Sequence, residues 1–211
     1  MDFTRPIEAL IPGATGRLLG ALARVEAELP VSTLATVAGV GRTRASAVLK
    51  ELAELGVISR RQVGPTVLVR LERANGAGQL VARLAGLRIQ VIEEMRELAR
   101  DLDPPPLSLT LFGSLAHGNA DAASDIDILA VRPAGGGERW AVSLTEFSSK
   151  AQVLAGNQVH ILDYDLSDLR RRYAVRDNAA GASFWQSVAE DALTLAGAGL
   201  QELMEAEHVA R

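Results

Sequence analysis

The 211-residue sequence contains no cysteine, which excludes disulfide bonds and thiolate metal sites and is compatible with a reducing compartment. Its three histidines are too few to favour a structural zinc site. No uncharged apolar run reaches the roughly 18 residues that suggest a membrane span. The first residues also lack the basic and then apolar order of a signal peptide. We therefore expect a cytoplasmic protein that does not contact a membrane.

The sequence also has little net charge, but its charged residues are unevenly distributed along the chain. The net charge of −4 argues against general nucleic-acid binding, and the 48 % hydrophobic content is sufficient for a globular core. Residues 42–70 nevertheless contain six Lys or Arg residues against two Glu, a local charge of +4. The composition therefore predicts one basic region within an acidic protein.

Two short apolar runs, Leu107–Phe112 and Ile126–Val131, are each of the length expected for a buried strand. A turn rich in glycine and aspartate separates them. Directly after the first run, Gly113 removes a side chain so that backbone N–H groups can approach an anion, and Ser114 adds a hydroxyl group. This turn predicts a phosphate-binding position.

Asp125 and Asp127 are two residues apart, so a strand would direct both carboxylates to one face and Ile126 and Ile128 into the core. Adjacent carboxylates repel each other unless a cation lies between them, and Mg²⁺ prefers such oxygen ligands. Together with the Gly113 turn, the pair predicts a site for a metal ion and a triphosphate.

The order of these motifs, Gly-Ser, ten residues and then Asp-x-Asp, resembles the signature of the DNA polymerase β nucleotidyltransferase superfamily, in particular its minimal branch. The resemblance covers roughly residues 104–200 and implies a mixed sheet flanked by helices. It also implies transfer of a nucleoside monophosphate from an NTP, here expected to be ATP, with Mg²⁺ or Mn²⁺ as cofactor. In this reading Asp125 and Asp127 are the catalytic metal ligands, and Gly113 and Ser114 bind the nucleotide.

Two positions depart from the pattern of this superfamily. A later strand normally carries a third carboxylate, but His160 stands there in Val-His-Ile-Leu, and Asp163 is at an odd offset that places it on the opposite face. An arginine common in Gly-Ser-x-Ala-Arg-Gly is replaced by His117. We interpret His160 as the third catalytic position, acting as a general base or as a ligand that suits Mn²⁺ better than Mg²⁺. His117 is assigned to nucleotide binding.

Residues 5–72 resemble a winged helix-turn-helix DNA-binding domain. The predicted elements are helices at 14–28, 32–38 with Ser32 as its N-cap, and 42–55 with Leu55 on its apolar stripe, then strands at 57–63 and 66–71. The resemblance implies that the third helix enters the major groove of duplex DNA. The residues expected to contact DNA are Arg42, Thr43, Arg44, Ser46 and Lys50 on that helix and Arg60, Arg61 and Arg70 on the hairpin. The alternative is a protein-interaction or dimerisation domain.

The expected fold is α+β, divided into a winged helix-turn-helix domain (1–74), a connecting helix (75–103) and a nucleotidyltransferase domain with C-terminal helices (104–211). Residues 75–78 are expected to be the interdomain break, and an apolar stripe predicts one helix from 80 to 101 that docks on the catalytic sheet, with a homodimer seam as the second interpretation. The remaining predictions are helices at 138–155, 167–176, 183–195 and 200–210, a strand at 158–162, N-caps at Ser167 and Ser183, and core positions for Phe184 and Trp185.

The leading functional hypothesis is a nucleotidyltransferase coupled to a domain that binds double-stranded DNA. The histidine replacements motivate an alternative, a transcriptional regulator whose nucleotidyltransferase domain senses nucleotide or is inactive. A third reading, by resemblance only, is an antitoxin-like enzyme that modifies a partner toxin. The expected partners are therefore NTP, DNA, and a protein acceptor or toxin.

Overall fold

The structure is a computed structural model that describes residues 1–174, 185, 188 and 192–205. Contacts divide the chain into two compact units, which we call the N-terminal unit (residues 4–87 with Asp2) and the C-terminal unit (residues 88–211 with Met1 and Phe3). No helix within the described residues has both the length and the apolar character to span a membrane.

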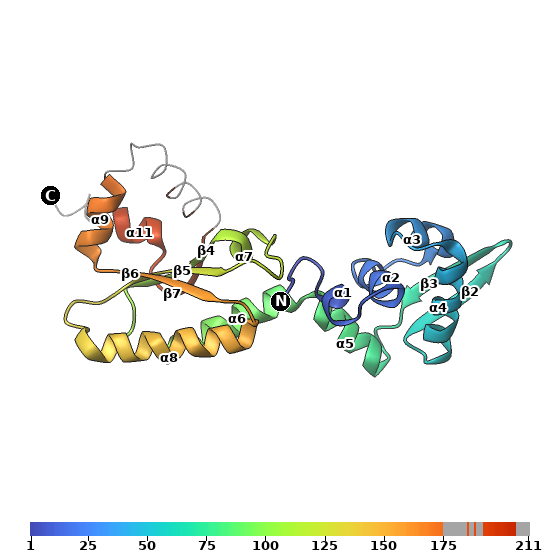
Figure 1. The fold of residues 1–211 in the computed structure, drawn as a ribbon, viewed down its shortest axis with the longest axis horizontal. Helices are drawn as coiled ribbons and strands as arrows, with labels where there is room; N and C mark the ends of the chain where they lie inside the picture. Colours follow the sequence, from blue (N-terminus) through green and yellow to red (C-terminus); the bar gives the residue numbers. More distant parts are fainter. Residues whose placement is uncertain (175–184, 186–187, 189–191, 206–211) are drawn as a thin grey trace. The chain divides into compact units, whose positions relative to one another are not determined.

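The N-terminal unit combines five helices with a small sheet (Figure 1). The antiparallel strands are arranged in the order β1-β3-β2. Its elements are α1 (Pro6–Leu10), α2 (Ala14–Ala23), β1 (Leu29–Pro30), α3 (Val31–Val37), α4 (Arg42–Glu54), β2 (Ile58–Val63), β3 (Thr66–Leu71) and α5 (Gly76–Ala85). The predicted hairpin at 57–71 is therefore confirmed.

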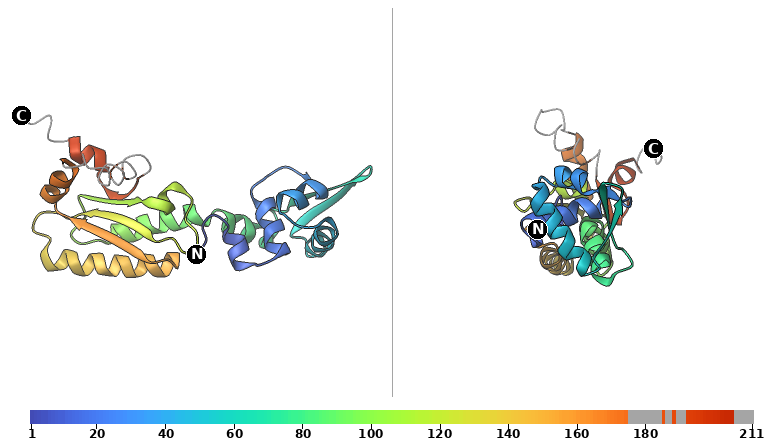
Figure 2. Two further views of the ribbon diagram at one scale, coloured as in Figure 1. Left: turned by 45° about the horizontal axis from the view of Figure 1, so that its top comes forward. Right: turned by 90° about the vertical axis from the view of Figure 1, so that its right-hand side faces the viewer.

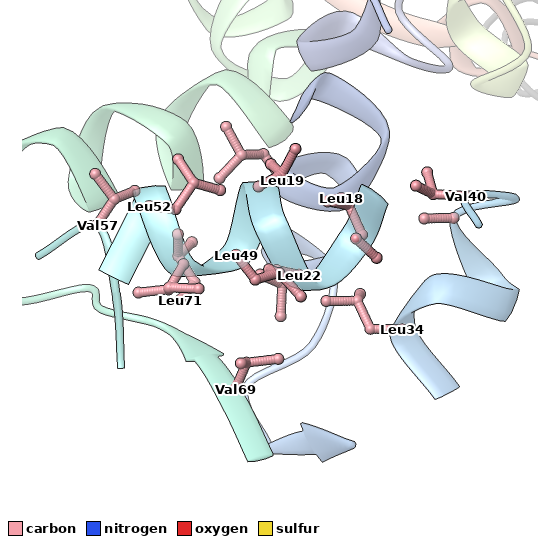
Figure 3. Packing of buried hydrophobic residues seen from close by; sticks show 14 of the residues in the cluster. Leu18, Leu19, Leu22, Leu34, Val40, Leu49, Leu52, Val57, Val69 and Leu71 are labelled. Carbon is pink, nitrogen blue, oxygen red and sulfur yellow. The ribbon is translucent and has the colours of Figure 1, made fainter. Parts of the chain in front are cut away.

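The core of this unit is formed where α2, α3 and α4 meet the sheet (Figure 3). Leu18, Leu34, Leu49 and Val69 have no exposed surface, and Leu22 is 1 % exposed. On α4 the buried positions recur at helical spacing, which leaves the intervening polar residues exposed. The apolar stripe of α4 thus fixes which of its residues face the solvent.

Three predictions for this unit are wrong in detail. The helix expected at 14–28 ends at Ala23 with Arg24 as its C-cap, and Leu29 and Pro30 form β1 beside β3, where Pro30 favours an extended backbone at Leu29. Ser32 is not an N-cap, since α3 begins at Val31 with Pro30 in the cap position. Leu55 follows the end of α4 and is 70 % exposed, so it does not belong to the apolar stripe.

The single helix expected at 80–101 is two helices, α5 and α6 (Leu87–Arg100), with Gly86 between them. Helix α5 packs on the N-terminal core, whereas α6 belongs to the C-terminal unit. Residues 75–78 are not a break, because the Asn75 side chain accepts hydrogen bonds from the N–H groups of Ala77 (2.9 Å) and Gly78 (3.1 Å). They form the capped start of α5. The functions predicted for residues 1–74, 75–103 and 104–211 stay predictions.

The C-terminal unit is built on a mixed sheet with the strand order β6-β5-β4-β7. Its strands are β4 (Ser108–Phe112), β5 (Ile126–Val131), β6 (Val159–Tyr164) and β7 (Leu193–Gly197). Strand β5 runs antiparallel to β4 and parallel to β6. Helices α6 and α8 (Gly137–Ala155) cover one face, and α9 (Leu166–Ala174) and α11 (Leu200–Glu205) lie on the other (Figures 1 and 2). The mixed sheet flanked by helices, the strands at 107–112, 126–131 and 158–162 and the helix at 138–155 are confirmed.

Other C-terminal predictions need correction. Residues 193–195, expected to end a helix, begin β7, which pairs with β4. The predicted N-cap at Ser167 is wrong. The backbone N–H of Asp168 donates a hydrogen bond to Oδ1 of Asp165 (2.8 Å), so Asp165 caps α9. Trp185 is 7 % exposed and packs edge-on against Tyr173, which confirms its core position. Ser183, Phe184 and residues 206–210 lie outside the described residues.

Candidate functional site

A tight turn connects β4 to the short helix α7 (Gly113–His117). Gly113 has a φ of +73°, and a Cβ atom added to it would lie 2.5 Å from Oδ2 of Asp127. Any side chain at position 113 would therefore displace the Asp127 carboxylate. The glycine therefore allows the backbone of the turn to approach the Asp127 carboxylate closely.

Asp125 directly precedes β5 and Asp127 is the second residue of that strand, on the face opposite to Ile126 and Ile128. Ile126 and Ile128 are at most 1 % exposed, whereas the Asp125 side chain is 48 % exposed and Asp127 is half-buried. In the sheet, Asp127 is in register with Phe112 of β4 and His160 of β6. The alternation expected from the spacing of these residues is therefore present.

His160 joins the two acids from the neighbouring strand. Its Nε2 atom lies 3.7 Å from Oδ2 of Asp125, and its backbone is paired with Asp127. Asp163, three residues later, faces α8 instead, where it accepts hydrogen bonds from Nη1 of Arg132 (3.0 Å) and Nε1 of Trp140 (3.1 Å). The structure thus brings His160 to the aspartates and keeps Asp163 away from them.

The electrostatics of Asp127 favour a bound cation. Burial raises the pKa of Asp127 above its ordinary value, the charge of His160 opposes this rise, and the charge of Asp125 adds to it. No donor from the described part of the chain hydrogen-bonds this carboxylate. Among the described residues, the ionised form is therefore compensated only by the charge of His160, and a metal ion would compensate it further.

The set of available metal ligands is small. The described residues contain no group of three or more His, Cys, Asp and Glu side chains that could hold a metal ion. Mg²⁺ is commonly held by one or two carboxylates together with substrate phosphates and water, rather than by a complete protein cage. Asp125 and Asp127 fit that mode of binding, in which the nucleotide completes the coordination.

His117 folds back onto the turn that begins α7. Its Nδ1 atom lies 2.6 Å from the carbonyl oxygen of Gly113, so Nδ1 carries the donated hydrogen. A neutral His117 then has only an acceptor at Nε2, and contact of Nε2 with a phosphate requires a second proton. Where the resemblance implies an arginine with a permanent charge, this chain thus has a histidine whose charge depends on protonation.

Arg88 at the start of α6 is a site-supporting residue that sequence reasoning missed. Its Nε donates to the carbonyl of Leu115 (2.7 Å), and its Nη2 donates to the carbonyl of Ala116. These bonds satisfy the C-terminal carbonyls of α7 and anchor the helix that follows Gly113. The sequence carries no signal for this contact, because 27 residues separate Arg88 from Leu115.

The basic region is on α4 and the β2–β3 hairpin. All residues predicted to contact DNA are exposed, and a groove of about 330 Å³ lies between α3, α4 and the hairpin. Some of the positive charge is compensated, since Arg61 pairs with Glu28 (2.5 Å), Arg70 with Glu72 (3.5 Å) and Lys50 with Glu54 (3.8 Å). Among the described residues, Arg42, Arg44 and Arg60 have no acidic partner.

Comparisons with known proteins give one family model and two similar solved structures. A family model described as "Nucleotidyltransferase domain" matches residues 89–177. A crystal structure of a toxin-antitoxin with AMP-PNP is 22 % identical, with 56 % of this chain and 84 % of that chain covered and a TM-score of 0.36. A crystal structure of a mutant toxin-antitoxin MntA-HpeT is 19 % identical, with the same coverage and a TM-score of 0.37. The search of curated proteins gave no match. The family model thus assigns a nucleotidyltransferase domain to residues 89–177, which include both aspartates and His160.

Proposed function

We propose that the C-terminal unit transfers a nucleoside monophosphate from an NTP to an acceptor in a reaction that needs a divalent metal ion. The observation that carries this proposal is the position of Asp127. Its carboxylate lies against the backbone of Gly113, beside Asp125 and His160, and its pKa is raised by burial with no described hydrogen-bond donor to compensate its charge.

In this proposal, one pair of residues binds the nucleotide and another pair binds the metal ion. Gly113 and Ser114 would bind the phosphates through the backbone of the turn and the serine hydroxyl, and Asp125 and Asp127 would hold Mg²⁺ or Mn²⁺. The metal ion, when bound, neutralises phosphate charge and so favours in-line displacement. ATP is the first nucleotide to test.

His160 is proposed to remove the proton from the acceptor hydroxyl. It lies on the same face as the two acids, and imidazole is a poorer ligand for Mg²⁺ than the carboxylate expected at this position. The carboxylate of Asp125, 3.7 Å from Nε2, would stabilise the imidazolium that forms.

The test is incubation of the full chain with ATP labelled at the α-phosphate, Mg²⁺ or Mn²⁺, and cell extract. We expect label transfer that falls at least about a hundredfold in Asp125→Asn/Asp127→Asn, because several kcal/mol of charge stabilisation would be lost. The matched control is Asp101→Asn/Asp103→Asn, which makes the same charge change at the same spacing after α6. Unchanged transfer in the first variant would contradict the assignment.

We also propose that the N-terminal unit is a winged helix that binds double-stranded DNA. The support is the exposed side of α4, where Arg42 and Arg44 have no described acidic partner, next to the β2–β3 hairpin. Replacing Arg44 with alanine should weaken duplex binding and lower the slope of log K against log salt by about one unit. Arg83→Ala on α5 of the same unit is the control. No duplex binding at low salt would rule out this function.

The histidine replacements favour a second candidate function, a DNA-binding regulator whose nucleotidyltransferase domain binds nucleotide without turnover. It predicts that Mn²⁺ and ATP bind while no label is transferred, and that His160→Asp restores transfer.

In the same assay, the chemical nature of any labelled product identifies the acceptor. A labelled protein would favour the antitoxin-like role, and a labelled nucleic acid would oppose it.

A further inference from the structure

A pocket of about 580 Å³ in the N-terminal unit is not used by either proposed function. It is formed by α1, α2, α3 and the segments that follow α2 and α3, on residues other than those of the basic region. Its lining joins apolar side chains, among them Val25, Leu29 and Val37, to the arginines Arg5, Arg17 and Arg24. The pocket therefore offers both positive charge and apolar surface to a ligand.

Two of these arginines are held in place without being neutralised. Nη1 of Arg17 donates to the carbonyl of Gly39 (2.9 Å), and Nη2 of Arg24 donates to the carbonyl of Thr4 (2.8 Å). A guanidinium group has five N–H donors, and a carbonyl has no net charge. Both side chains therefore keep donors and a full positive charge for a further partner.

The only acidic residue that lines the pocket is Glu8. No ion pair joins Glu8 to Arg5, Arg17 or Arg24, all four of which the structure describes. Asp2 accepts a hydrogen bond from the backbone N–H of Arg5 (2.9 Å), but it does not line the pocket. The lining thus has three positive groups against one negative group, a net charge of +2, and like charges in a concave site favour a bound anion.

We propose that this pocket binds a small organic anion whose carboxylate or phosphate group contacts Arg17 and Arg24. The apolar body of the ligand would lie against Val25, Leu29 and Val37. The volume is within the range of about 300–1,000 Å³ that is typical of small-molecule sites. The planar, multidentate guanidinium group suits both carboxylate and phosphate.

The test uses 8-anilinonaphthalene-1-sulfonate, an aromatic sulfonate, as a fluorescent probe of the full chain. We expect saturable binding that phenylphosphate or benzoate displaces, and the stronger competitor distinguishes the phosphate from the carboxylate class. The neutral analogue N-phenyl-1-naphthylamine should bind at least about tenfold more weakly, as expected for the loss of a charged hydrogen bond.

Variants locate the site. Arg17→Gln should weaken probe binding about tenfold, and Glu8→Gln should strengthen it about threefold because it removes the one acidic group of the lining. Val37 is 69 % exposed, so Val37→Asp adds a repelling charge without disturbing the core and should also weaken binding. Arg83→Gln, in the same unit, should leave binding unchanged.

A second apolar groove, between α6 and α8, provides the decisive control because the probe could bind there instead. It is lined by Glu94, Leu98 and Val153, and Val153 is 85 % exposed. Probe binding that is lost in Val153→Asp but unchanged in Val37→Asp and Glu8→Gln would overturn the proposal. Equal affinity for the neutral analogue would overturn it as well.

Discussion

Acidic side chains on the two faces of the C-terminal sheet differ in their hydrogen-bond partners. On the face covered by α8, Asp163 accepts hydrogen bonds from Arg132 and Trp140. On the opposite face, Asp127 accepts none from a described residue, and burial raises its pKa. Acids whose partners are supplied by the fold stabilise it, whereas an acid held against a glycine without a partner is available for a ligand.

This difference supports the proposal that one face has a structural role and the other a chemical role. A half-buried carboxylate without compensation costs stability, and such costs are typical of sites that are prepared for a ligand. The predictions below change one face at a time and are ordered from the largest expected effect to the smallest.

The largest effect is expected from Trp140→Ala on the structural face. Trp140 is 1 % exposed, so its removal leaves a cavity and should lower the free energy of unfolding by about 3–5 kcal/mol. Urea denaturation measures this change. Val142→Ala, at a position 54 % exposed on the same helix, is the control and should cost little. A loss below about 1 kcal/mol for Trp140→Ala would contradict the packing.

Asp163→Ala should lower the free energy of unfolding by about 1–3 kcal/mol, because it leaves the buried Nε1–H of Trp140 without an acceptor. In the Trp140→Phe background this donor is absent, so the same substitution should cost less. A double-mutant cycle with urea denaturation measures the coupling. A coupling of zero would show that the hydrogen bond does not stabilise the sheet.

On the chemical face, His160→Asp should strengthen the binding of Mg²⁺ and a non-hydrolysable ATP analogue by about tenfold, since a carboxylate replaces a nitrogen ligand. Calorimetric titration measures the affinity. His160→Asn, which removes the imidazole without adding a charge, is the control. Equal affinities for the two variants would mean that position 160 does not face the metal ion.

Asp127→Asn should raise the free energy of unfolding of the metal-free protein at neutral pH by less than about 1 kcal/mol, because the half-buried side chain is partly screened by water. The raised pKa means that the folded wild type binds this proton more tightly than the unfolded chain does. Its stability is therefore fully present below the ordinary value of 3.8 and falls as the pH rises through the raised pKa.

The advantage of Asp127→Asn should accordingly appear above that pH range and vanish below it. Urea denaturation at several pH values, in the presence of a chelator, tests this dependence. A variant that is less stable than the wild type at neutral pH would show that the Asp127 carboxylate is compensated inside the fold.

Much of the site could be predicted from local sequence, because its determinants are local. The alternation that separates Asp127 from Ile126 and Ile128 depends only on a strand, and the length of the apolar run indicates that strand. The face of Asp163 followed from the same alternation. Its partners Arg132 and Trp140 did not, because they lie 31 and 23 residues away in the chain.

The errors arose where tertiary contacts override a local pattern. The apolar period continues across Gly86, so the sequence does not show that α5 and α6 pack in different units. The local pattern at residues 193–195 predicts the end of a helix, but in the structure these residues pair with β4 as a strand. In the basic region, the pairing of Glu28 with Arg61 reduces the charge available to DNA, and their separation of 33 residues hides it from the sequence.

The most direct test of the central claim is the anomalous scattering of Mn²⁺ in a crystal of the wild-type chain grown with a non-hydrolysable ATP analogue. We expect a Mn²⁺ peak between the carboxylates of Asp125 and Asp127, with the phosphates of the analogue at the Gly113–Ser114 turn. A nucleotide bound elsewhere, or Mn²⁺ that avoids both aspartates, would contradict the account.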